Sequence, residues 1–328
     1  MAERIIHWGM IGCGDVTRKK SAPSFNKIPY SRLVAVGSRT PGKARDYAGR
    51  NGVPAWHEDP MDVITDPAVD IVYVATPPGS HARYALHSID AGKPVYIEKP
   101  MARTGEECDL INRRAEERGI PVFVAYYRRA LDYFLRVKKI IDAGTLGRIL
   151  TVHLEQWFPA RPEDADREHP PWRVIPEISG GGYFHDVGCH ALDILFCMLG
   201  DPVKSCGTAS NIAGLYEPED TLSALVTLPA GVILTGSWSF VMPVSLQKDL
   251  VEVTGEKGRL TFSVFSFDPI VYFDGKQETR YTTVQPEHIQ MPYITTIVSQ
   301  LRGKGSCPST GLTAAVTSRV MDQILAGC

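Results

Sequence analysis

The sequence has 328 residues, which is long for a single hydrophobic core and predicts two domains. Apolar residues make up 44% and charged residues 22%, with a formal net charge of -2 and a pI near 6.5. This balance is that of an ordinary globular protein, and it offers neither nucleic acid nor an anionic membrane an attractive surface. No apolar run approaches the roughly 20 residues that cross a bilayer, so we expect no membrane span.

The N-terminus and the cysteines indicate the compartment. The first residues run directly into a strand-like stretch and lack the basic and apolar regions of a secretory signal. The cysteines are scattered, odd in number and without a CxxC spacing: Cys13, Cys108, Cys189, Cys197, Cys206, Cys307 and Cys328. We therefore expect small buried thiols rather than a disulfide framework or a zinc site, and a cytoplasmic protein without a bound metal.

The first third of the chain alternates short apolar runs with helical patterns. The predicted strands are residues 4–11, 33–38, 69–75, 94–98 and 121–125. The predicted helices are residues 15–27, 41–51, 81–91 and 105–118. Thr104 with Glu107 forms a capping box before the last helix, and Gly119 marks its end. Apolar strands that alternate with helices predict a parallel sheet covered on both faces, so residues 1–122 form a doubly wound α/β domain.

The remaining residues, 123–328, show a different pattern. The predicted strands are residues 149–158, 203–211, 221–228, 232–240, 250–255 and 259–262. Turn signals between them, and the imperfect alternation over residues 222–228, indicate an α+β domain with a large open, mainly antiparallel sheet. A sheet with one uncovered face needs a partner, which predicts a homodimer or homotetramer through this domain. Residues 159–177 are rich in proline and charge and are predicted to form a long loop.

A glycine cluster joins the first strand to the first helix. Gly12, Cys13 and Gly14 lie at this turn, followed by Asp15 and Val16. Small residues let the backbone approach a pyrophosphate, and the start of the helix supplies free N–H groups. Such a cluster is often only a tight turn, but its position after the first strand of a βαβ unit favours a dinucleotide site.

The end of the second strand indicates which dinucleotide binds. An acid there would accept the ribose hydroxyls of NAD, but this chain has Ser38 and Arg39, with Lys43 one turn later. A guanidinium binds a 2′-phosphate bidentately, so we expect NADP(H) to be favoured over NAD(H). Two cations in a solvated loop are the alternative interpretation. Further predicted cofactor contacts follow later strands: Thr76, Pro77, His81, Glu98 and Lys99.

Two segments carry the candidate catalytic residues. Lys99 follows an apolar strand, at the sheet edge where ligands of α/β proteins collect, and burial near a nicotinamide would lower its pKa toward about 7–8. Asp186, His190 and Asp193 stand at i, i+4 and i+7 and are predicted to share one face of an apolar helix that follows three glycines and ends near residue 199. A surface lysine and a buried core histidine are the alternatives. Zinc is not favoured, because no third strong ligand lies nearby in the sequence.

These motifs together resemble the glucose–fructose oxidoreductase / inositol dehydrogenase / MocA family. The resemblance rests on Gly12-Cys13-Gly14, Glu98-Lys99-Pro100 and Asp186-x-Gly188-x-His190-x-x-Asp193, and residues 124–129 are similar to the segment that joins the family's two domains. It extends over essentially the whole chain. It implies a Rossmann domain, an α+β domain whose open sheet forms an oligomer interface, and a nicotinamide cleft lined by Lys99, Asp186 and His190. Thr17 and residues 127–130 depart from the family pattern.

The resulting hypothesis is an enzyme that moves hydride between the nicotinamide and a hydroxyl or carbonyl carbon. His190 donates or accepts the proton, Lys99 polarises the substrate oxygen and Asp186 orients the pair, although whether Lys99 or His190 is the primary acid/base stays open. The family implies a small polyhydroxylated substrate, such as a sugar, cyclitol, keto-sugar or dihydrodiol. Candidate substrate contacts are Tyr126, Arg128, Trp157, Trp172, Tyr183 and Tyr293, together with Asp186 and His190. Arg128, Arg129 and Arg161 also permit an acidic substrate.

Two other functions fit the same fold. A non-catalytic nucleotide-sensing regulator has no need of Lys99, Asp186 and His190, all of which are present here. A nicotinamide-dependent glycosidase would hold its cofactor without net turnover of added cofactor. The dehydrogenase or reductase is the preferred interpretation.

Overall fold

The computed structural model describes residues 4–14, 17 and 21–328, which fall into two compact units. Unit 1 comprises Met1–Leu131 and Pro286–Ala315, and unit 2 comprises Asp132–Gln285 and Val316–Cys328. This division differs from a border at residue 122, because the chain returns to unit 1 near its end.

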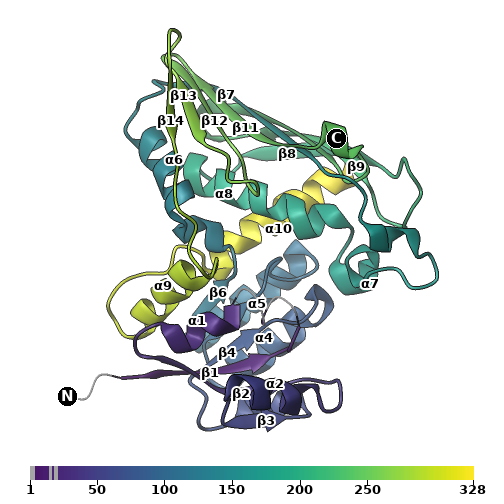
Figure 1. The fold of residues 1–328 in the computed structure, drawn as a ribbon, viewed down its shortest axis with the longest axis vertical. Coiled ribbons are helices and arrows are strands. Elements are labelled where there is room, and N and C mark those ends of the chain that lie inside the picture. Colours follow the sequence, from purple (N-terminus) through teal and green to yellow (C-terminus); the bar gives the residue numbers. More distant parts are fainter. Residues whose placement is uncertain (1–3, 15–16, 18–20) are drawn as a thin grey trace. The chain divides into compact units, whose positions relative to one another are not determined.

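The described part of unit 1 contains a six-stranded parallel sheet, sheet A, with the order β3-β2-β1-β4-β5-β6 (Figure 1). Its strands are β1 Ile6–Ile11, β2 Ser31–Gly37, β3 Ala55–His57, β4 Ile71–Val74, β5 Val95–Ile97 and β6 Val122–Val124. Strand order reverses between β1 and β4, and at such a reversal the carboxyl ends of the strands form a crevice for ligands. The predicted doubly wound domain is confirmed.

Helices cover both faces of sheet A. They are α1 Ala22–Lys27, α2 Lys43–Asn51, α3 Pro60–Thr65, α4 His81–Asp90, α5 Gly105–Arg118 and α9 Met291–Leu301. Helices α3, α4 and α5 pack in series, while α1 contacts α9. The Thr104 hydroxyl caps α5 by accepting a hydrogen bond from the Glu107 N–H, as predicted, but the Glu107 carboxylate binds the Arg103 N–H instead of closing the box. The short elements β3 and α3 were not predicted.

Contacts within unit 1 explain why it includes residues beyond 122. Strand β6 is a member of sheet A, and Phe123 forms an isolated bridge with Thr310 of the returning segment. The Arg129 guanidinium donates to the carbonyl oxygen of Pro308 at 2.9 Å. A border at residue 122 would therefore cut through the sheet.

The described part of unit 2 is built on an eight-stranded sheet, sheet B, with the order β14-β13-β12-β11-β7-β10-β9-β8. Its strands are β7 Ile149–Trp157, β8 Lys204–Ser210, β9 Thr221–Thr227, β10 Ile233–Ser239, β11 Lys248–Gly255, β12 Gly258–Phe262, β13 Ile270–Phe273 and β14 Glu278–Tyr281. Neighbours are antiparallel except for the parallel pair of β7 and β10. The predicted mainly antiparallel sheet is confirmed, and β13 and β14 are additions to it.

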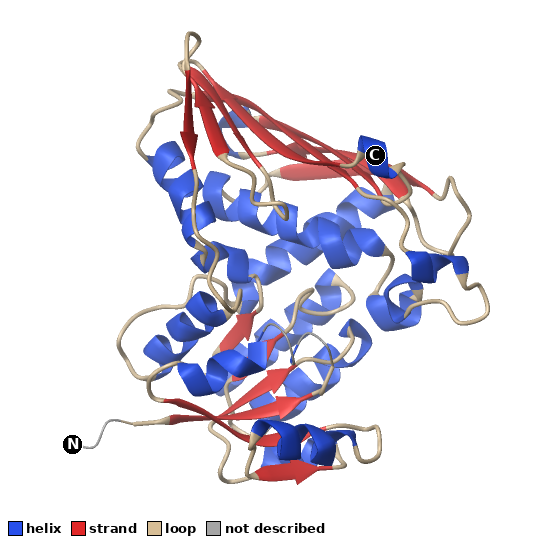
Figure 2. Cartoon of the chain, in the orientation of Figure 1, coloured by secondary structure: helices blue, strands red, loops and turns tan. Residues whose placement is uncertain are grey.

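Helices of unit 2 lie along one face of sheet B (Figure 2). They are α6 Asp132–Asp142, α8 Cys189–Leu199 and the part of α10, Gly311–Ala326, that belongs to this unit. The side chains of Val152, Leu154 and Gln156 are buried, whereas their neighbours on β7 are less so, which is the alternation of a sheet with one covered face. No described helix is both long and apolar enough to cross a membrane.

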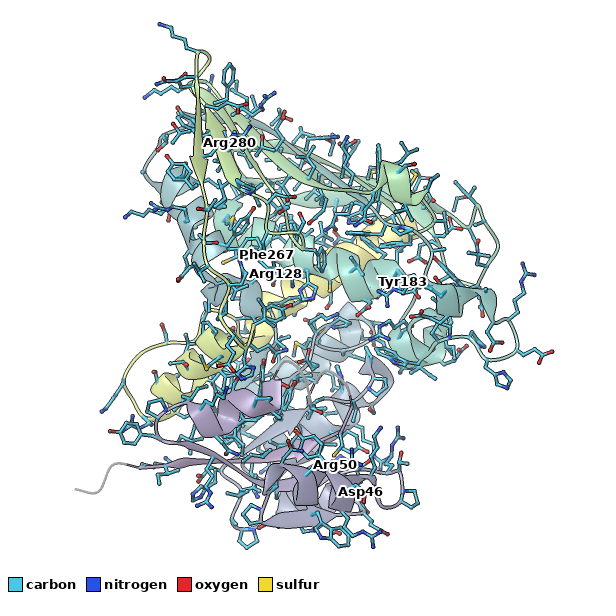
Figure 3. The ribbon with its side chains drawn as sticks, viewed as in Figure 1. Asp46, Arg50, Arg128, Tyr183, Phe267 and Arg280 are labelled. Carbon is cyan, nitrogen blue, oxygen red and sulfur yellow. A yellow bond between two sulfur atoms is a disulfide. The ribbon has the colours of Figure 1, made fainter. Side chains whose placement is uncertain are left out.

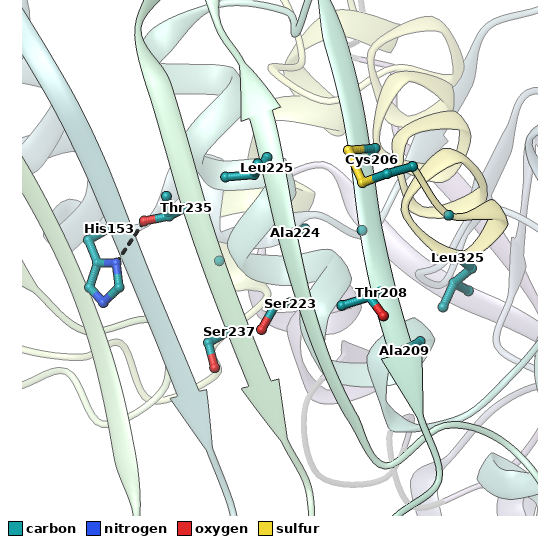
Figure 4. A pocket seen from close by; sticks show the side chains of 14 residues that line it. His153, Cys206, Thr208, Ala209, Ser223, Ala224, Leu225, Thr235, Ser237 and Leu325 are labelled. Atoms are coloured by element: carbon teal, nitrogen blue, oxygen red, sulfur yellow. Dashed lines mark hydrogen bonds between the residues drawn. A yellow bond between two sulfur atoms is a disulfide. The ribbon is translucent and has the colours of Figure 1, made fainter.

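The other face of sheet B carries a depression of about 770 Å³ next to a disulfide (Figure 4). Cys206 of β8 is bonded to Cys328, with their Cα atoms 4.8 Å apart. The prediction of thiols alone is therefore wrong for these two residues, because residues 122 apart in sequence meet only through the fold. Of the other cysteines, Cys108, Cys189 and Cys307 are buried and two are partly exposed. The cytoplasmic location rested on the cysteine pattern and stays a prediction.

The long loop at residues 159–177 contains short turns. These are the 3₁₀ turns Pro162–Ala165 and Trp172–Val174, and the single-turn helix α7, Pro176–Ser179, begins before the predicted loop ends. Each turn has a proline at or next to its start, where the missing N–H is not needed.

Candidate active site

The glycine loop after β1 has the backbone that a phosphate cradle requires. Gly12 has φ of +102°, and a Cβ at this position would lie 2.5 Å from the Ala75 carbonyl oxygen, so only glycine fits. A Cβ at Gly14 would meet no described atom within 4 Å. The loop is thus fixed at Gly12, and the described residues leave space beside Gly14 for a phosphate to approach.

The rest of this loop is held by its own side chains. The Thr17 hydroxyl is buried and donates to the Gly14 carbonyl oxygen at 2.7 Å, so threonine closes the turn where the family pattern has a smaller residue. Burial raises the pKa of Cys13 to about 11, against a smaller opposing effect of the nearby Lys43 ammonium. Cys13 is therefore a neutral thiol at pH 7. Asp15 and Val16, also predicted to bind the cofactor, lie outside the described residues.

Positive charge gathers at the carboxyl end of β2. Arg39 and Lys43 are exposed, and residues 36–43 contain no acid. The buried Ser38 hydroxyl accepts a hydrogen bond from the Thr40 N–H at 3.2 Å, which shapes the turn that presents Arg39. On α2 the nearest acid, Asp46, lies 3.8 Å from Arg50, its partner on the same helix (Figure 3).

His81, at the start of α4, connects two loops of unit 1. Its ring is fully buried, with Nδ1 3.0 Å from the Pro100 carbonyl oxygen and Nε2 2.7 Å from the Thr76 carbonyl oxygen. Burial lowers the pKa of His81, and the two carbonyl contacts oppose this. Thr76 and Pro77 are partly exposed and accessible to a ligand, while the buried His81 holds the Thr76 backbone in place through its contact with the Thr76 carbonyl oxygen.

Glu98 is the centre of a buried hydrogen-bond network beside Lys99. Its Oε1 accepts from the Tyr73 hydroxyl at 2.6 Å and from the Gln290 amide at 2.8 Å, while Oε2 accepts from the Lys99 N–H at 3.3 Å. Tyr96 donates in turn to Gln290 at 2.9 Å. Glu98 is only 7% exposed, and this network positions the backbone at the partly exposed Lys99.

In unit 2, Asp186 is bound by two arginines. Its Oδ2 lies 3.0 Å from Arg173 Nε and 3.7 Å from Arg161 Nη2. Residues Phe184–Gly188 form a π-helical turn before α8, so the prediction of one continuous α-helix is wrong here. A π turn bonds residue i to i+5, which changes the spacing around the helix axis.

His190 follows in the first turn of α8. It is 5% exposed, and its ring meets the edge of Phe265 at a centroid distance of 5.7 Å. Asp193 is 1% exposed, within the predicted helix that ends at Leu199. Asp186 and His190 thus lie on either side of the junction between the π turn and α8, within one unit.

The remaining predicted substrate contacts fall into separate places. Tyr183 lies next to Arg161, and Trp172 next to Arg173, at ring distances of 4.3 and 4.5 Å. Trp157 bonds through Nε1 to Ser237, which lines the depression on the other face of sheet B from α8.

Three more of these residues are buried in unit 1. They are Tyr126, Arg128 and Tyr293, and Arg128 is labelled in Figure 3. The Tyr293 hydroxyl donates to the Ser309 carbonyl oxygen at 2.7 Å, which identifies it as core packing.

Sequence reasoning missed three side chains of the site. Gln290 stands almost 200 residues from Glu98, and Arg173 and Asp164 lie in a charged loop with many similar residues. The only local signal was the position of Arg173 beside Trp172. Contacts of this kind depend on the fold and have no spacing rule.

The residues of unit 1 fit a nicotinamide dinucleotide. The positive φ at Gly12 matches a tight turn, and the space that the described residues leave beside Gly14 matches a pyrophosphate.

Known proteins share this architecture and sequence. The family described as "Oxidoreductase family, NAD-binding Rossmann fold" (GFO_IDH_MocA) matches residues 6–126, and the family described as "GFO/IDH/MocA C-terminal domain" matches residues 134–261. Together the two matches include most of the chain.

The chain is 35% identical to "Oxidoreductase P35" of Formosa agariphila over 320 residues, which are 98% of each chain. It is 28% identical to "scyllo-inositol 2-dehydrogenase (NAD(+))" of Bacillus subtilis over 203 residues, 62% of this chain and 56% of the relative. The chain thus aligns with just over half the length of this second relative. A levoglucosan dehydrogenase solved with NADH and levoglucosan superposes with a TM-score of 0.86 at 21% identity, covering 98% of this chain and 96% of the other, which shows a shared fold.

Proposed function

This chain belongs to the GFO/IDH/MocA oxidoreductase family, and we propose that it is an NADP(H)-preferring enzyme acting on a sugar, cyclitol, keto-sugar or dihydrodiol. The reaction moves a hydride between the nicotinamide and a carbon that bears a hydroxyl or carbonyl group. The observation that carries the proposal is the loop at Gly12 and Gly14, fixed by its positive φ at the point where strand order reverses.

Residues of unit 1 would hold the cofactor. The N–H groups of the glycine loop bind the pyrophosphate, and Arg39 with Lys43 binds the 2′-phosphate of NADP(H). Support for this preference comes from the exposed guanidinium and ammonium and from the lack of an acid in residues 36–43. When bound, the nicotinamide supplies or accepts the hydride.

Proton transfer is assigned to Lys99, His190 and Asp186. His190 gives or takes the proton of the substrate oxygen, and Lys99 stabilises the charge that develops on that oxygen. The Asp186 carboxylate orients the pair. Arg173, 3.0 Å from Asp186, holds that carboxylate in place.

The test is turnover with added substrate. Keto-sugars and polyols are screened for oxidation of NADPH or reduction of NADP+ by the absorbance of the reduced nicotinamide. Lys99→Met is expected to lower kcat by roughly 100- to 1,000-fold, the usual cost of removing one group that stabilises developing charge in the transition state. Lys139→Met, which removes an exposed lysine of α6, is the matched control and is expected to leave kcat unchanged.

Near-normal turnover by Lys99→Met would contradict the role of Lys99. A purified protein that binds the cofactor but turns over no member of the panel would favour a nucleotide sensor instead.

We further propose that a second copy of the chain covers the open face of sheet B. Leu225 and Ile233 are 53% and 41% exposed, although β9 and β10, which carry them, have a strand on either side. Apolar side chains in such positions are typical of an interface. Leu225→Glu is expected to lower the mass measured by light scattering, while Leu135→Glu, on exposed α6, leaves it unchanged.

A further inference from the structure

A small cavity in unit 2 lies next to Asp186 and His190, the proposed catalytic residues of that unit. Its volume is about 230 Å³, and the described residues that line it are Phe158, Pro159, Arg161, Tyr183, Val187, Phe240 and Phe265. Phe265 also contacts the ring of His190, and Val187 follows Asp186 in the chain. The cavity is smaller than the roughly 300–1,000 Å³ of a drug-sized pocket, so it takes a single ring or part of one. We call it the Arg161 cavity.

Among the described residues that line it, Arg161 is the one charged group. The other walls are aromatic or apolar, so Arg161 is the group of this described lining that attracts an anion. A guanidinium is planar and matches the two oxygens of a carboxylate. The lining therefore suits a compact molecule with an apolar face and one carboxylate.

The Arg161 side chain is held in place before any ligand arrives. Its guanidinium carbon lies 4.3 Å from the centre of the Tyr183 ring, and its backbone N–H donates to Asp164 Oδ2 at 2.8 Å. Asp164 is 2% exposed and also accepts the Tyr183 hydroxyl at 2.5 Å. These contacts fix the ring on which the guanidinium stacks and reduce the entropy lost on binding.

Two acids near Arg161 have other partners. Asp186 lies closer to Arg173, at 3.0 Å, than to Arg161, at 3.7 Å, so Arg173 supplies most of its compensating charge. Asp164 accepts hydrogen bonds from the Arg161 backbone N–H and from the Tyr183 hydroxyl, and these disperse its charge. Arg161 is 36% exposed at its side chain and keeps positive charge for a ligand.

We propose that Arg161 binds the carboxylate of the substrate, and that the substrate class is therefore sugar acids. This inference rests on the proposed oxidoreductase function and narrows it. The sugar ring packs on the aromatic walls of the Arg161 cavity, and Arg161 selects the acid over the neutral sugar of the same ring.

The experiment measures binding of matched acidic and neutral sugars to the full-length protein by calorimetry, with and without NADPH. The probes are D-glucuronate and D-galacturonate, compared with D-glucose and D-galactose. We expect at least one acid to bind roughly 10- to 100-fold more tightly than its neutral counterpart. Arg161→Gln should remove this difference and Arg161→Lys should keep part of it. Arg167→Gln, an exposed arginine of the same loop, should leave it unchanged.

Equal binding of acid and neutral sugar by the wild-type protein would overturn the inference without any variant. An acid preference that survives in a folded Arg161→Gln protein would overturn it as well. NADPH binding, followed in the same samples, separates the two proposals. If NADPH binds but no acid preference is seen, only the proposed substrate class is contradicted. If an acid preference depends on Arg161 but NADPH does not bind, the proposed oxidoreductase function is contradicted and the carboxylate site is supported.

Discussion

Sheet A is parallel throughout and covered by helices, whereas sheet B is mainly antiparallel and carries helices of its own unit along one face. In unit 1 the ligand loop depends on backbone geometry at Gly12, which a sequence motif records directly. In unit 2 the chemistry depends on contacts between distant side chains, such as Asp186 with Arg173. A site that depends on backbone geometry can therefore be predicted from a local sequence motif, whereas a site that depends on tertiary side-chain contacts cannot.

The disulfide offers the largest expected effect on stability, and it belongs to unit 2. Replacing Cys206 and Cys328 by serine removes a disulfide between residues 122 apart in the sequence. This is expected to lower the free energy of unfolding by about 4 kcal/mol. Thermal unfolding with and without reductant is the measurement. Reductant should lower Tm of the wild-type protein and leave the double variant unchanged.

Peptide mapping without reductant is the direct control, and it should recover the two cysteines in one linked pair. Free thiols at both positions in protein purified under air would contradict this account of unit 2.

A single methyl group tests the backbone account of unit 1. Gly12→Ala forces alanine to φ of +102° and puts its Cβ 2.5 Å from a carbonyl oxygen, which should cost about 3 kcal/mol of stability. At Gly14 an added Cβ would contact no described atom within 4 Å, so Gly14→Ala should keep the stability while weakening cofactor binding. Urea unfolding and NADPH titration measure the two effects. Equal loss of stability in both variants would contradict this difference between Gly12 and Gly14.

Elements with strong local signals were predicted from the sequence, and elements without such signals were not. Residues 105–118 lie between a capping threonine, Thr104, and a terminal glycine, Gly119, and the observed α5 has these bounds. Strand β3 has three residues and β14 is mostly polar, so neither has a hydrophobic pattern long enough to detect. The π turn at Phe184–Gly188 was missed because its residues have the same apolar pattern as an α-helix.

The candidate site also has one part that a sequence motif predicts and another part that it does not. The glycine loop and the cations after β2 follow a recorded motif, and the structure describes them where the motif put them, except at Asp15 and Val16. The Glu98–Gln290 bond and the Arg173–Asp186 pair join segments with no fixed spacing. The disulfide belongs to this second group.

Acid should destabilise unit 2 through His185. Burial lowers the pKa of this side chain to about 4, while the unfolded chain keeps the ordinary value of 6.5. The unfolded state therefore binds the proton first, so the stability that His185 contributes is complete above pH 6.5 and is lost as pH falls toward 4. The total is about 3 kcal/mol. Urea unfolding from pH 7 to 4 measures it.

His185→Phe should flatten this acid dependence, and His169→Phe, at an exposed position, should leave it unchanged. An identical acid limb in His185→Phe would show that another group is responsible.

The smallest of these effects concerns the support of Lys99. Gln290→Met removes the amide that bonds Glu98 and Tyr96, and leaving these buried groups without it should cost about 2 kcal/mol. Gln277→Met, in an exposed turn of unit 2, is the matched control. Calorimetry measures the Tm and the free energy of unfolding of both variants. An unchanged Tm for Gln290→Met would show that the hydrogen bonds of Gln290 do not stabilise the fold.

The central claim is that unit 1 binds a nicotinamide dinucleotide and prefers the 2′-phosphorylated form. Its most direct test is the Kd of NADPH and of NADH, measured by fluorescence and calorimetry for the wild-type protein, Arg39→Asp and Arg32→Asp. Arg32 is an exposed residue near the start of β2, roughly 20 Å from Arg39 along the strand direction. NADPH is expected to bind roughly 10- to 100-fold more tightly than NADH, a preference lost in Arg39→Asp and kept in Arg32→Asp. Failure of every dinucleotide to bind the wild-type protein would contradict the central claim.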